Sequence, residues 1–562
     1  MSEQTFRQPM ATNVQAKFSD LPTAETERST FDMSHSWKGT ANHSRIIPVM
    51  CQEVLPGDTF NINSTVFMRL ATPLKPIMDN VEATVHYFFV PNRLVWDNWQ
   101  FFMGERDKPS DDPTTKSVPQ VKININIEQE AIFDPGGFNI LVKETTLQDY
   151  FGIPMVQGTT PQEEILIEVN ALPFRAYSLI MNEWYRNQNI TGGVNIDFGD
   201  GGEQVGFDTY GYVTRRLKKA DYFTRALPWP QKGDPVFIPL GTEAAVTGIG
   251  TYSQTFEYSN QAVYETDQTD KIYYDSTQIQ SGADNGVHWL MEEDPNNPGF
   301  PNIRADLKET TAVTINDLRT AFQIQRLLER DARGGTRYIE ILLSHFNVAS
   351  PDARLQRPEY LGGGNTQIMV NPIASTVATT DAPQAELAAV GTGLLKAGIT
   401  HSFVEHGFLF CLLSTRADLT YQNGLNRFWS RQTRYDYYWP ALSHLGEQNI
   451  LNKELFLDPD NPAGVNEETW GYQERYAEYR YQPSLITGKF RSNDPASLDV
   501  WHLSQDFDAL SPLNPFFIVE NAPIDRIVAV QDEPHYLIDC WHQMTATRVM
   551  PVYAVPGLVD HF

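Results

Sequence analysis

Residues 58–103 constrain the fold of this chain most strongly, because they alternate twice between apolar and polar side chains. In the first stretch, 59–70, every second side chain is apolar except Ser64, and the intervening ones are polar except Phe67. Two prolines then interrupt the pattern, since proline has no backbone N–H to donate to a neighbouring strand. The alternation resumes over 81–89. A two-residue period predicts strands with one buried face, so this part of the chain indicates a sheet protein.

A short helix is predicted directly after the second strand. Pro91 ends the strand, and Asn92 is a favourable N-cap residue. Apolar side chains then recur at helical spacing as far as Met103, and Gly104 is the predicted stop.

Three more helices are predicted further along the chain. The first covers 172–187, where apolar side chains recur at roughly helical spacing. The second begins at Thr314, which forms a capping-box-like pattern with Asp317, and ends at a pair of glycines. The third, about 337–346, could equally be a strand.

Strands are predicted to return over 366–440, with a last strand at 535–553. Residues 401–412 are predicted to form one strand that is apolar in both registers toward its end. A strand of this kind is buried on both faces.

The composition shifts along the chain predict four segments. They are an N-terminal arm (1–45), a first set of strands with loops and a helix (46–235), an acidic surface insertion (236–303), and helices with the remaining strands (304–562). Within 236–303, ten acidic residues stand against a single base, Lys271. This segment has too few aliphatic residues for a large core, so we expect it to project into solvent, although a mere flexible loop is an alternative.

Several short motifs lie in a fixed order over nearly the whole chain. They are Ser36-Trp37-Lys38-Gly39, Leu55-Pro56-Gly57-Asp58-Thr59, Ala71-Thr72-Pro73, Tyr87-Phe88-Phe89-Val90-Pro91-Asn92-Arg93, Phe174-Arg175-Ala176-Tyr177, Asn182-Glu183-Trp184-Tyr185-Arg186, Asp221-Tyr222-Phe223-Thr224, Ala226-Leu227-Pro228-Trp229-Pro230-Gln231, Arg354-Leu355-Gln356-Arg357-Pro358-Glu359-Tyr360-Leu361-Gly362-Gly363 and Val555-Pro556-Gly557-Leu558-Val559-Asp560-His561-Phe562. Each motif alone is weak, but their joint order is specific. Together they resemble the major capsid protein of small single-stranded DNA phages, in particular the gokushovirus branch of the microviruses.

This resemblance implies a mainly β fold, an eight-stranded viral jelly-roll sandwich with long inter-strand insertions and a few helices. It implies that many copies form a T=1 icosahedral shell around circular single-stranded DNA, assembled in the cytoplasm of a bacterial host and found in the virion. Internal scaffolding and pilot proteins and a host cell-surface receptor are the implied partners. The first and last strands of a jelly roll lie near each other, so the two ends of the chain would bracket one sandwich.

The resemblance also implies that the insertion 236–303 projects at the threefold axes as a host-contact protrusion. Its tyrosines are the candidate contact residues. They are Tyr258, Tyr264, Tyr273 and Tyr274.

The charge balance is strongly acidic, with 43 basic and 70 acidic residues and a formal net charge of −27. Such a chain is not expected to wrap nucleic acid with its whole surface, but it can carry one basic face. The three cysteines, Cys51, Cys411 and Cys540, have no disulfide or zinc spacing, so we expect three buried free thiols in a reducing compartment.

The N-terminal residues lack the apolar core of a signal peptide, and the longest apolar run is too short to span a bilayer. We therefore expect a chain without membrane insertion.

Positive charge concentrates in three segments, 211–235, 416–439 and 472–491. In the last two, arginines alternate with aromatic residues, a pattern that suits single-stranded nucleic acid because guanidinium groups pair with phosphates and rings stack on bases. The candidate DNA-binding residues are Arg427, Trp429, Arg431, Arg434, Tyr435, Arg475 and Arg480. Contacts between subunits use the same residue types, so that alternative stays open, and residues 215–219 could be no more than a solvated turn.

Catalytic and cofactor motifs are missing from the sequence. It contains neither the nucleophile elbow Gly-x-Ser-x-Gly nor the zinc motif His-Glu-x-x-His. The acidic loop 197–203 could offer oxygen atoms to calcium, but its spacing is not that of an EF-hand, and we predict a solvated turn. We therefore predict no enzyme, no cofactor and no metal ligand.

A β-sandwich protein that binds or hydrolyses carbohydrate is the alternative function. Its tryptophans would serve as sugar platforms, and paired carboxylates as catalysts. Five tryptophans lie in predicted apolar faces, however, so core packing accounts for most of them. They are Trp96, Trp99, Trp184, Trp429 and Trp439.

Overall fold

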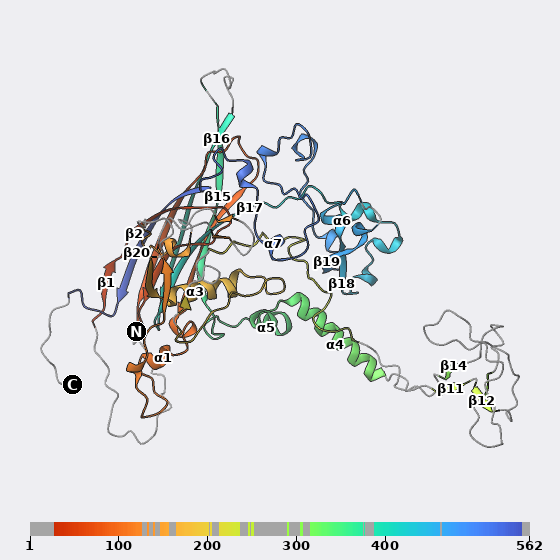
Figure 1. Cartoon of the computed structure of the whole chain (residues 1–562), viewed down its shortest axis with the longest axis horizontal. Helices are drawn as coiled ribbons and strands as arrows, with labels where there is room; N and C mark the ends of the chain where they lie inside the picture. Colours follow the sequence, from red (N-terminus) through yellow and green to blue (C-terminus); the bar gives the residue numbers. More distant parts are fainter. Residues whose placement is uncertain are drawn as a thin grey trace, which may run out of the picture. The chain divides into compact units, whose positions relative to one another are not determined.

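A computed structural model of the chain shows a mostly β protein (Figure 1). It describes residues 27–125, 132–133, 139–140, 146–156, 165–201, 203–204, 213–236, 245–247, 249–251, 289–291, 304–306, 315–374, 376, 387–460 and 464–553. The chain divides into two compact units, one made of residues 1–230 and 336–562 and the other of Gln231–Gly335. The four predicted segments remain a prediction.

The first unit is built on nine antiparallel strands in the order β1-β20-β4-β16-β15-β5-β17-β3, with β2 also pairing with β20. Their bounds are β1 Ser29–Asp32, β2 His35–Ala41, β3 Ile47–Val54, β4 Thr59–Leu70, β5 Val81–Pro91, β15 Glu359–Ala374, β16 Leu387–Ser402, β17 Gly407–Ala417 and β20 Tyr536–Arg548.

Strand β15 joins the two halves of this arrangement. Its first part, from Glu359 to Ile368, pairs with β5, and its second part, from Met369 to Ala374, pairs with β16. The first sheet therefore holds β1 and β2, β20, β4 and β16, and the second holds β15, β5, β17 and β3. Because β1 and β2 occupy successive positions along β20, each sheet has four strand positions.

This strand order confirms the predicted jelly-roll sandwich, and it brings the first and last described strands together as expected. Most of the main hydrophobic core lies between the two sheets. Large side chains that point into the space between the sheets include Phe60, Ile62, Tyr87, Leu409 and Tyr536.

Burial differs between the two sheets. In β4 buried residues alternate with exposed or half-buried ones, so the first sheet has one face toward the core and one away from it. In β5 and β17 almost every residue is buried. The outer face of the second sheet is covered by α3 (Leu172–Ile180), whose Tyr177 hydroxyl donates to the carbonyl of Ile46 at 2.8 Å, and by Trp184, whose ring lies 5.5 Å from that of Phe88.

The prediction of one strand over 401–412 is wrong. Strand β16 ends at Ser402 and β17 begins at Gly407, and both pair with different neighbours. Phe403 between them turns its ring onto Phe89 at 4.6 Å, so an apolar residue of the turn continues the hydrophobic pattern. The expected burial on both faces is found in β17.

The helix predicted over 92–103 is also wrong as a single element. Two short turns replace it, the 3-10 turn η1 (Asn92–Leu94) and the helix α1 (Trp99–Phe102), with Trp96 buried between them. Gly104 ends α1 with a φ of +107°, in the left-handed region that suits glycine.

The other three predicted helices are observed. Helix α3 continues into a π-helical turn, η4 (Met181–Tyr185), so residues 172–185 are helical. The second unit contains α4 (Ile315–Gly334), and the first contains α5 (Tyr338–Phe346). Helix α5 ends at Asn347, which has a φ of +55°.

Smaller elements complete the description. The short strands are β6 Gln120–Asn124, β7 Ile132–Phe133, β8 Asn139–Ile140, β9 Leu166–Asn170, β10 Glu203–Gln204, β11 Ala245–Thr247, β12 Ile249–Thr251, β13 Trp289–Met291, β14 Arg304–Asp306, β18 Glu447–Leu451 and β19 Thr469–Glu474. The short helices are η2 Pro113–Thr115, α2 Leu147–Tyr150, η5 Arg427–Ser430, η6 Arg434–Asp436, η7 Pro440–Leu442, α6 Asn452–Leu455, η8 Val465–Glu467, η9 Ala477–Tyr479, η10 Gly488–Phe490, η11 Asp499–Trp501, α7 Pro515–Ile518 and η12 Ile524–Arg526.

A second, smaller core forms within the long connection between β17 and β20, residues 418–535. It packs aromatic side chains of this connection, such as Trp470 and Phe517, against Tyr222 and Phe223. Isolated bridges from Leu217 to Val519 and from Leu227 to Tyr472 join the two segments.

The cysteines only partly follow the expectation. Cys411 and Cys540 are buried free thiols in β17 and β20, as predicted, but Cys51 is exposed on β3, which pairs with a neighbour on one side only. In the part of the chain that the structure describes, no helix has both the length and the apolar content needed to cross a membrane.

Candidate nucleic-acid interface

The candidate DNA-binding residues all lie in the connection between β17 and β20, around the hairpin of β18 and β19. The turns η5 and η6 precede this hairpin, and η9 follows it. The chain folds this way because Asn426 caps η5 by accepting from the Phe428 amide at 3.1 Å, and Asp436 accepts from the Thr433 amide at 2.7 Å.

Arg427 is committed to a buried ion pair. Its Nη1 atom lies 2.9 Å from Oε1 of Glu454 and donates to the carbonyl of Asn449 at 2.6 Å. The Tyr222 hydroxyl donates to the other oxygen of Glu454 at 3.1 Å. Burial raises the pKa of Glu454, and Arg427 opposes that rise.

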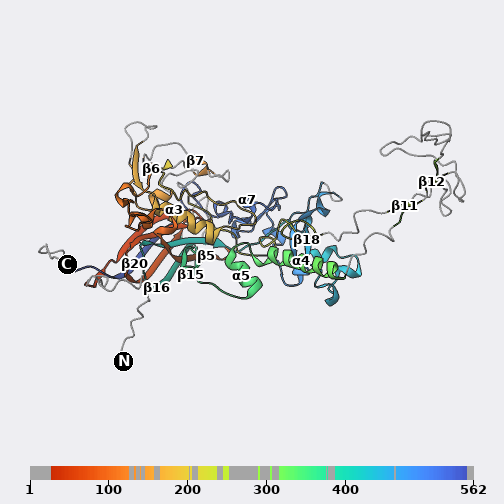
Figure 2. The same cartoon turned by 90° about the horizontal axis from the view of Figure 1, so that it is seen from below.

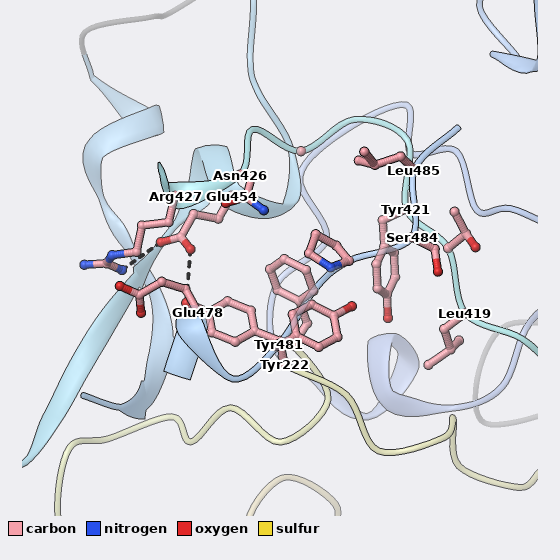
Figure 3. Close-up of a pocket in the computed structure, with 14 residues that line it drawn as sticks. Tyr222, Leu419, Tyr421, Asn426, Arg427, Glu454, Glu478, Tyr481, Ser484 and Leu485 are labelled. Atoms are coloured by element: carbon pink, nitrogen blue, oxygen red, sulfur yellow. Dashed lines mark hydrogen bonds and ion pairs between the residues drawn. The ribbon is translucent and has the colours of Figure 1, made fainter. Parts of the chain in front are cut away.

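Figure 3 shows this ion pair at one end of a small cavity of about 60 Å³, where the rings of Tyr222, Tyr421 and Tyr481 gather. Arg427 therefore serves the stability of the second core.

Arg431 is also held inside the protein. Its guanidinium lies 3.5 Å from Glu478 and 4.3 Å above the ring of Tyr479, and only 12% of its side chain is exposed. A planar guanidinium that pairs with a carboxylate and stacks on a ring has one fixed orientation.

Arg475 joins these two arginines at one cavity. Its guanidinium lies 4.8 Å from the ring of Tyr476. Arg427, Arg431, Arg475 and Lys453 line a polar cavity of about 410 Å³, which we call the arginine cavity. Its acidic lining residues are Asp436, Glu467 and Glu478.

Lys453 was not among the predicted residues. It approaches the cavity from α6, between the two arginine-rich segments, and pairs with Glu467 at 2.5 Å. A lone lysine outside any aromatic cluster gives no sequence signal of this role.

The remaining candidates lie on the surface. Arg434 is exposed, and its guanidinium lies 5.3 Å from the rings of both Tyr435 and Trp439. Trp429 is 70% exposed. Arg480 forms an ion pair with Glu474 at the surface. The exposed rings of residues 428–439 form what we call the aromatic surface, which consists of Phe428, Trp429, Tyr435, Tyr437, Tyr438 and Trp439.

The aromatic surface contradicts the expectation of buried tryptophans at two positions. Trp96 is fully buried, and Trp99 and Trp184 pack against the main core, but Trp429 and Trp439 are exposed. The two exposed tryptophans lie on or beside 3-10 turns, where the helical or strand spacing that the sequence suggested does not apply.

Residues 215–219 are more than a solvated turn, because two of their bases are buried, although Lys219 is exposed. Arg216 is buried and donates to the Ser414 hydroxyl at 2.9 Å. Lys218 is buried as well, donates to Gln505 at 2.8 Å and lies 4.3 Å from the ring of Phe517. Burial lowers the pKa of Lys218 to about 8. Arg216 therefore ties the segment to β17 and Lys218 ties it to the second core, and the burial of both side chains keeps nucleic acid from them.

In the acidic loop 197–203, Asp197 and Asp200 are exposed, as a solvated turn predicts, and Asp200 also contacts neighbouring residues. Asp200 accepts from the Trp96 indole at 2.8 Å and from the Asn98 amide at 2.9 Å, and it pairs with Lys116. Hydrogen bonds, above all from Lys116, lower its pKa to about 2. Among the residues described, no three His, Cys, Asp or Glu side chains gather as a metal site would require.

The predicted host-contact residues lie outside the described residues. They are Tyr258, Tyr264, Tyr273 and Tyr274.

In chemical terms, the residues of this site suit binding. The aromatic surface presents rings next to a guanidinium, which suits stacking and phosphate pairing. In the arginine cavity, each glutamate faces a base, so no carboxylate pair is poised for acid–base work.

Comparison with known proteins gives consistent matches over almost the full length of the chain. The family model described as "Capsid protein (F protein)" matches residues 19–558. Capsid protein VP1 of Bdellovibrio phage phiMH2K is 42% identical over 560 residues, which cover 98% of this chain and 98% of that protein.

Two further relatives carry the same name. Capsid protein VP1 of Chlamydia phage 1 is 40% identical over 601 residues, covering 96% of this chain and 97% of that protein. Capsid protein VP1 of Spiroplasma virus 4 is 32% identical over 562 residues, covering 94% and 95%.

Proposed function

The chain belongs to the capsid protein (F protein) family, as a microvirus major capsid protein, and we propose that its copies assemble into a closed T=1 icosahedral shell around circular single-stranded DNA. The observation that carries this proposal is the family match over residues 19–558, on a chain whose strands form a jelly roll. Repeated contacts between different patches of identical subunits close into rings and shells without any catalytic group.

The proposed role is structural rather than enzymatic. The relatives are named capsid proteins, and the carboxylates of the arginine cavity are engaged in ion pairs. The carbohydrate-active alternative loses support because Trp96, Trp99 and Trp184 are packed in the main core.

We propose that the aromatic surface contacts the DNA through Arg434, Trp429 and Tyr435. Their exposure and the proximity of guanidinium to rings support this role. Of the other predicted DNA-binding residues, Arg427, Arg431 and Arg480 form ion pairs with glutamates that offset their charge, so we propose that Arg475 of the arginine cavity would add more positive charge than they do. Contact between subunits is the second candidate role, because exposed aromatic rings with arginine are also typical of protein interfaces.

The acidic insertion 236–303 is proposed to attach the particle to the host, with Tyr258, Tyr264, Tyr273 and Tyr274 at the contact. The further partners we propose are internal scaffolding and pilot proteins and a host cell-surface receptor. The chain would then be part of the virion, after assembly in the cytoplasm of the bacterial host.

Expression followed by sedimentation and electron cryomicroscopy tests the proposed assembly. We expect closed particles of uniform size that contain nuclease-protected single-stranded DNA. Compact single molecules under every ionic condition, even with helper chains supplied, would contradict the proposal.

Deletion of residues 240–300 tests the insertion separately. The expected product is a shell that has lost its surface projections and no longer binds host cells. Loss of the shell itself would show that this segment holds the shell together.

A further inference from the structure

The first sheet of the jelly roll has a second face, which points away from the core. We call it the outer sheet face. It collects alternate side chains of β1, β2, β20, β4 and β16, and those of β20 and β4 are mostly exposed. In Figure 2, α3 lies on one side of the sandwich, and β20 and β16 lie toward the other. Among the described helices, none is drawn over β20 and β16 on the side away from α3.

An apolar stripe crosses the outer sheet face. Phe67 of β4 lies opposite Leu394 of β16, and it is diagonal to Trp541 of β20, because Trp541 pairs with Thr65. Side chains in these register positions are close enough to contact. Trp541 is 50% exposed, Phe67 45% and Leu394 55%, although all three belong to large apolar types. Two aromatic rings on adjacent strands therefore face solvent.

The charge of this face is opposite in sign to that of the chain. Its exposed bases are Lys38, Arg69 and Lys396, and its exposed acids are Asp32 and Asp539. Lys38 lies 3.1 Å from Asp539, which neutralises one of the two acids. On a chain with a formal net charge of −27, a face with more bases than acids is suited to an anionic partner.

Beside the stripe, the face carries uncharged hydrogen-bonding groups. Exposed amides and hydroxyls alternate along the strands toward the other end of the sheet. They are Asn61, Asn63, Thr400, Gln543 and Thr545. Such groups can donate to phosphates and pair with base edges at a lower desolvation cost than charged groups.

We propose that the outer sheet face binds single-stranded DNA, with bases stacked on Trp541 and Phe67 and phosphates paired with Lys396 and Arg69. This inference rests on the proposed function, because it names a surface for the DNA that the shell would enclose. An open antiparallel sheet with exposed aromatic rings is a known platform for single strands.

A protein partner fits the charged and amide groups less well. Contact with the surface of another protein would bury the exposed amides and hydroxyls of this face, and a flat apolar contact would leave several of them without hydrogen bonds. DNA satisfies both the rings and the polar groups, since each nucleotide brings a π face together with an anionic, hydrogen-bonding backbone.

The test measures binding of the unassembled chain to a fluorescent oligothymidylate of about 20 nucleotides, at several salt concentrations. Trp541→Ala removes a stacking ring and is expected to weaken binding about tenfold or more. Lys396→Gln should flatten the dependence of log K on log salt by about 0.7. Tyr553→Ala, which removes another exposed ring, is the matched control and should bind like the wild type. Thermal unfolding verifies that each variant is folded.

Photocrosslinking to the same oligonucleotide, followed by peptide mapping, identifies the contact directly. Adducts on the peptides that contain Trp541 or Phe67 are expected. The inference is overturned if Trp541→Ala binds as tightly as the wild type, or if adducts form only at Trp429, Tyr435 and their neighbours. It is also overturned if Trp541→Ala lowers particle yield while DNA affinity is unchanged, since another protein would then cover the face.

The two proposals fail in different ways. If wild-type chain binds no single-stranded DNA and its particles contain none, the proposed enclosure of DNA fails. If the wild type binds and its particles are filled, but the outer sheet face is not involved, only this inference fails.

Discussion

The ion pair between Arg427 and Glu454 makes one of the candidate DNA-binding arginines part of the folded core. The carboxylate of Glu454 is almost fully buried, and its oxygens are satisfied by Arg427, Tyr222 and the Leu451 amide. A buried charge without a partner is costly, so the arginine is required by the fold whether or not DNA is present.

Arg427→Ala is expected to lower the free energy of unfolding by about 3 kcal/mol at pH 7.5. The loss should be smaller at pH 5. The pKa of Glu454 is already raised by burial, and removing Arg427 raises it further, so at low pH the carboxyl takes up a proton and the uncompensated charge disappears. Urea unfolding of the unassembled chain at both pH values measures this difference. The exposed Arg434→Ala is the control, with an expected change within about 0.5 kcal/mol. Equal losses for the two variants would contradict the assignment.

His542 makes the stability of the folded chain depend on pH. Its ring is buried in β20, where Nδ1 lies 2.7 Å from the Ser64 hydroxyl and Nε2 lies 3.1 Å from the Val49 carbonyl. Burial, with a smaller contribution from His35, lowers its pKa from 6.5 to about 4. The folded chain therefore prefers the neutral ring, and this preference stabilises the fold fully above pH 6.5 and is lost as the pH falls toward 4.

From this residue alone we expect the free energy of unfolding to fall by about 3 kcal/mol between pH 6.5 and pH 4. His542→Gln should reduce that slope, because an amide does not titrate. Urea titrations of both proteins across this range provide the measurement. Parallel pH profiles for variant and wild type would show that His542 does not titrate in this range.

A substitution in the second sheet is expected to lower the free energy of unfolding more than the same substitution in the first sheet. Leu409 in β17 is fully buried within a strand covered on both faces, whereas Leu394 in β16 is 55% exposed. Leu409→Ala is expected to cost about 2–5 kcal/mol, because it leaves a cavity in the main core. Leu394→Ala makes the same chemical change at the outer sheet face and should cost about 0.5 kcal/mol or less. Thermal or urea unfolding of the two variants compares them directly, and similar costs would contradict the one-sided burial of the first sheet.

The sequence predicted elements best where a single period governs burial. The alternation in 59–70 and 81–89 corresponds closely to β4 and β5, because each has an apolar face that must reach the core. The predictions for 401–412 and 92–103 are wrong, because apolar side chains between two elements fold back into the core. Phe403 and Trp96 are such side chains, and in the sequence they cannot be told from part of a continuous strand or helix.

The candidate interface was predictable in composition but not in geometry. The arginine-rich segments were recognised, yet nothing in the sequence distinguishes Arg431, which pairs inside with Glu478, from Arg434, which lies exposed among rings. Arg431 and Glu478 are far apart in the sequence, as are Arg427 and Arg475 around the arginine cavity, whereas the rings beside Arg434 are close neighbours in the sequence. The outer sheet face was missed because its residues come from strands at opposite ends of the chain, and only the register brings Phe67 and Trp541 together.

The net negative charge of the whole molecule opposes both assembly and DNA enclosure, and salt affects these two processes in opposite directions. Copies that each carry a formal charge of −27 repel one another, and salt weakens this repulsion, because the screening length falls to about 8 Å at physiological ionic strength. Contacts between bases of the chain and phosphates weaken in the same conditions, since salt competes for both. The two processes therefore depend on salt with opposite signs.

Raising sodium chloride from about 0.02 to 0.5 M should increase the fraction of DNA-free chain that sediments as particles, while it lowers the affinity of unassembled chain for a single strand. Analytical ultracentrifugation and fluorescence anisotropy on the same samples measure the two trends. The expected repulsion comes mainly from acidic side chains that lie outside the contacts between subunits. Assembly that falls with salt in parallel with DNA affinity would instead mean that complementary charges hold the copies together, and that the acidic surface of one copy meets the basic outer sheet face of another.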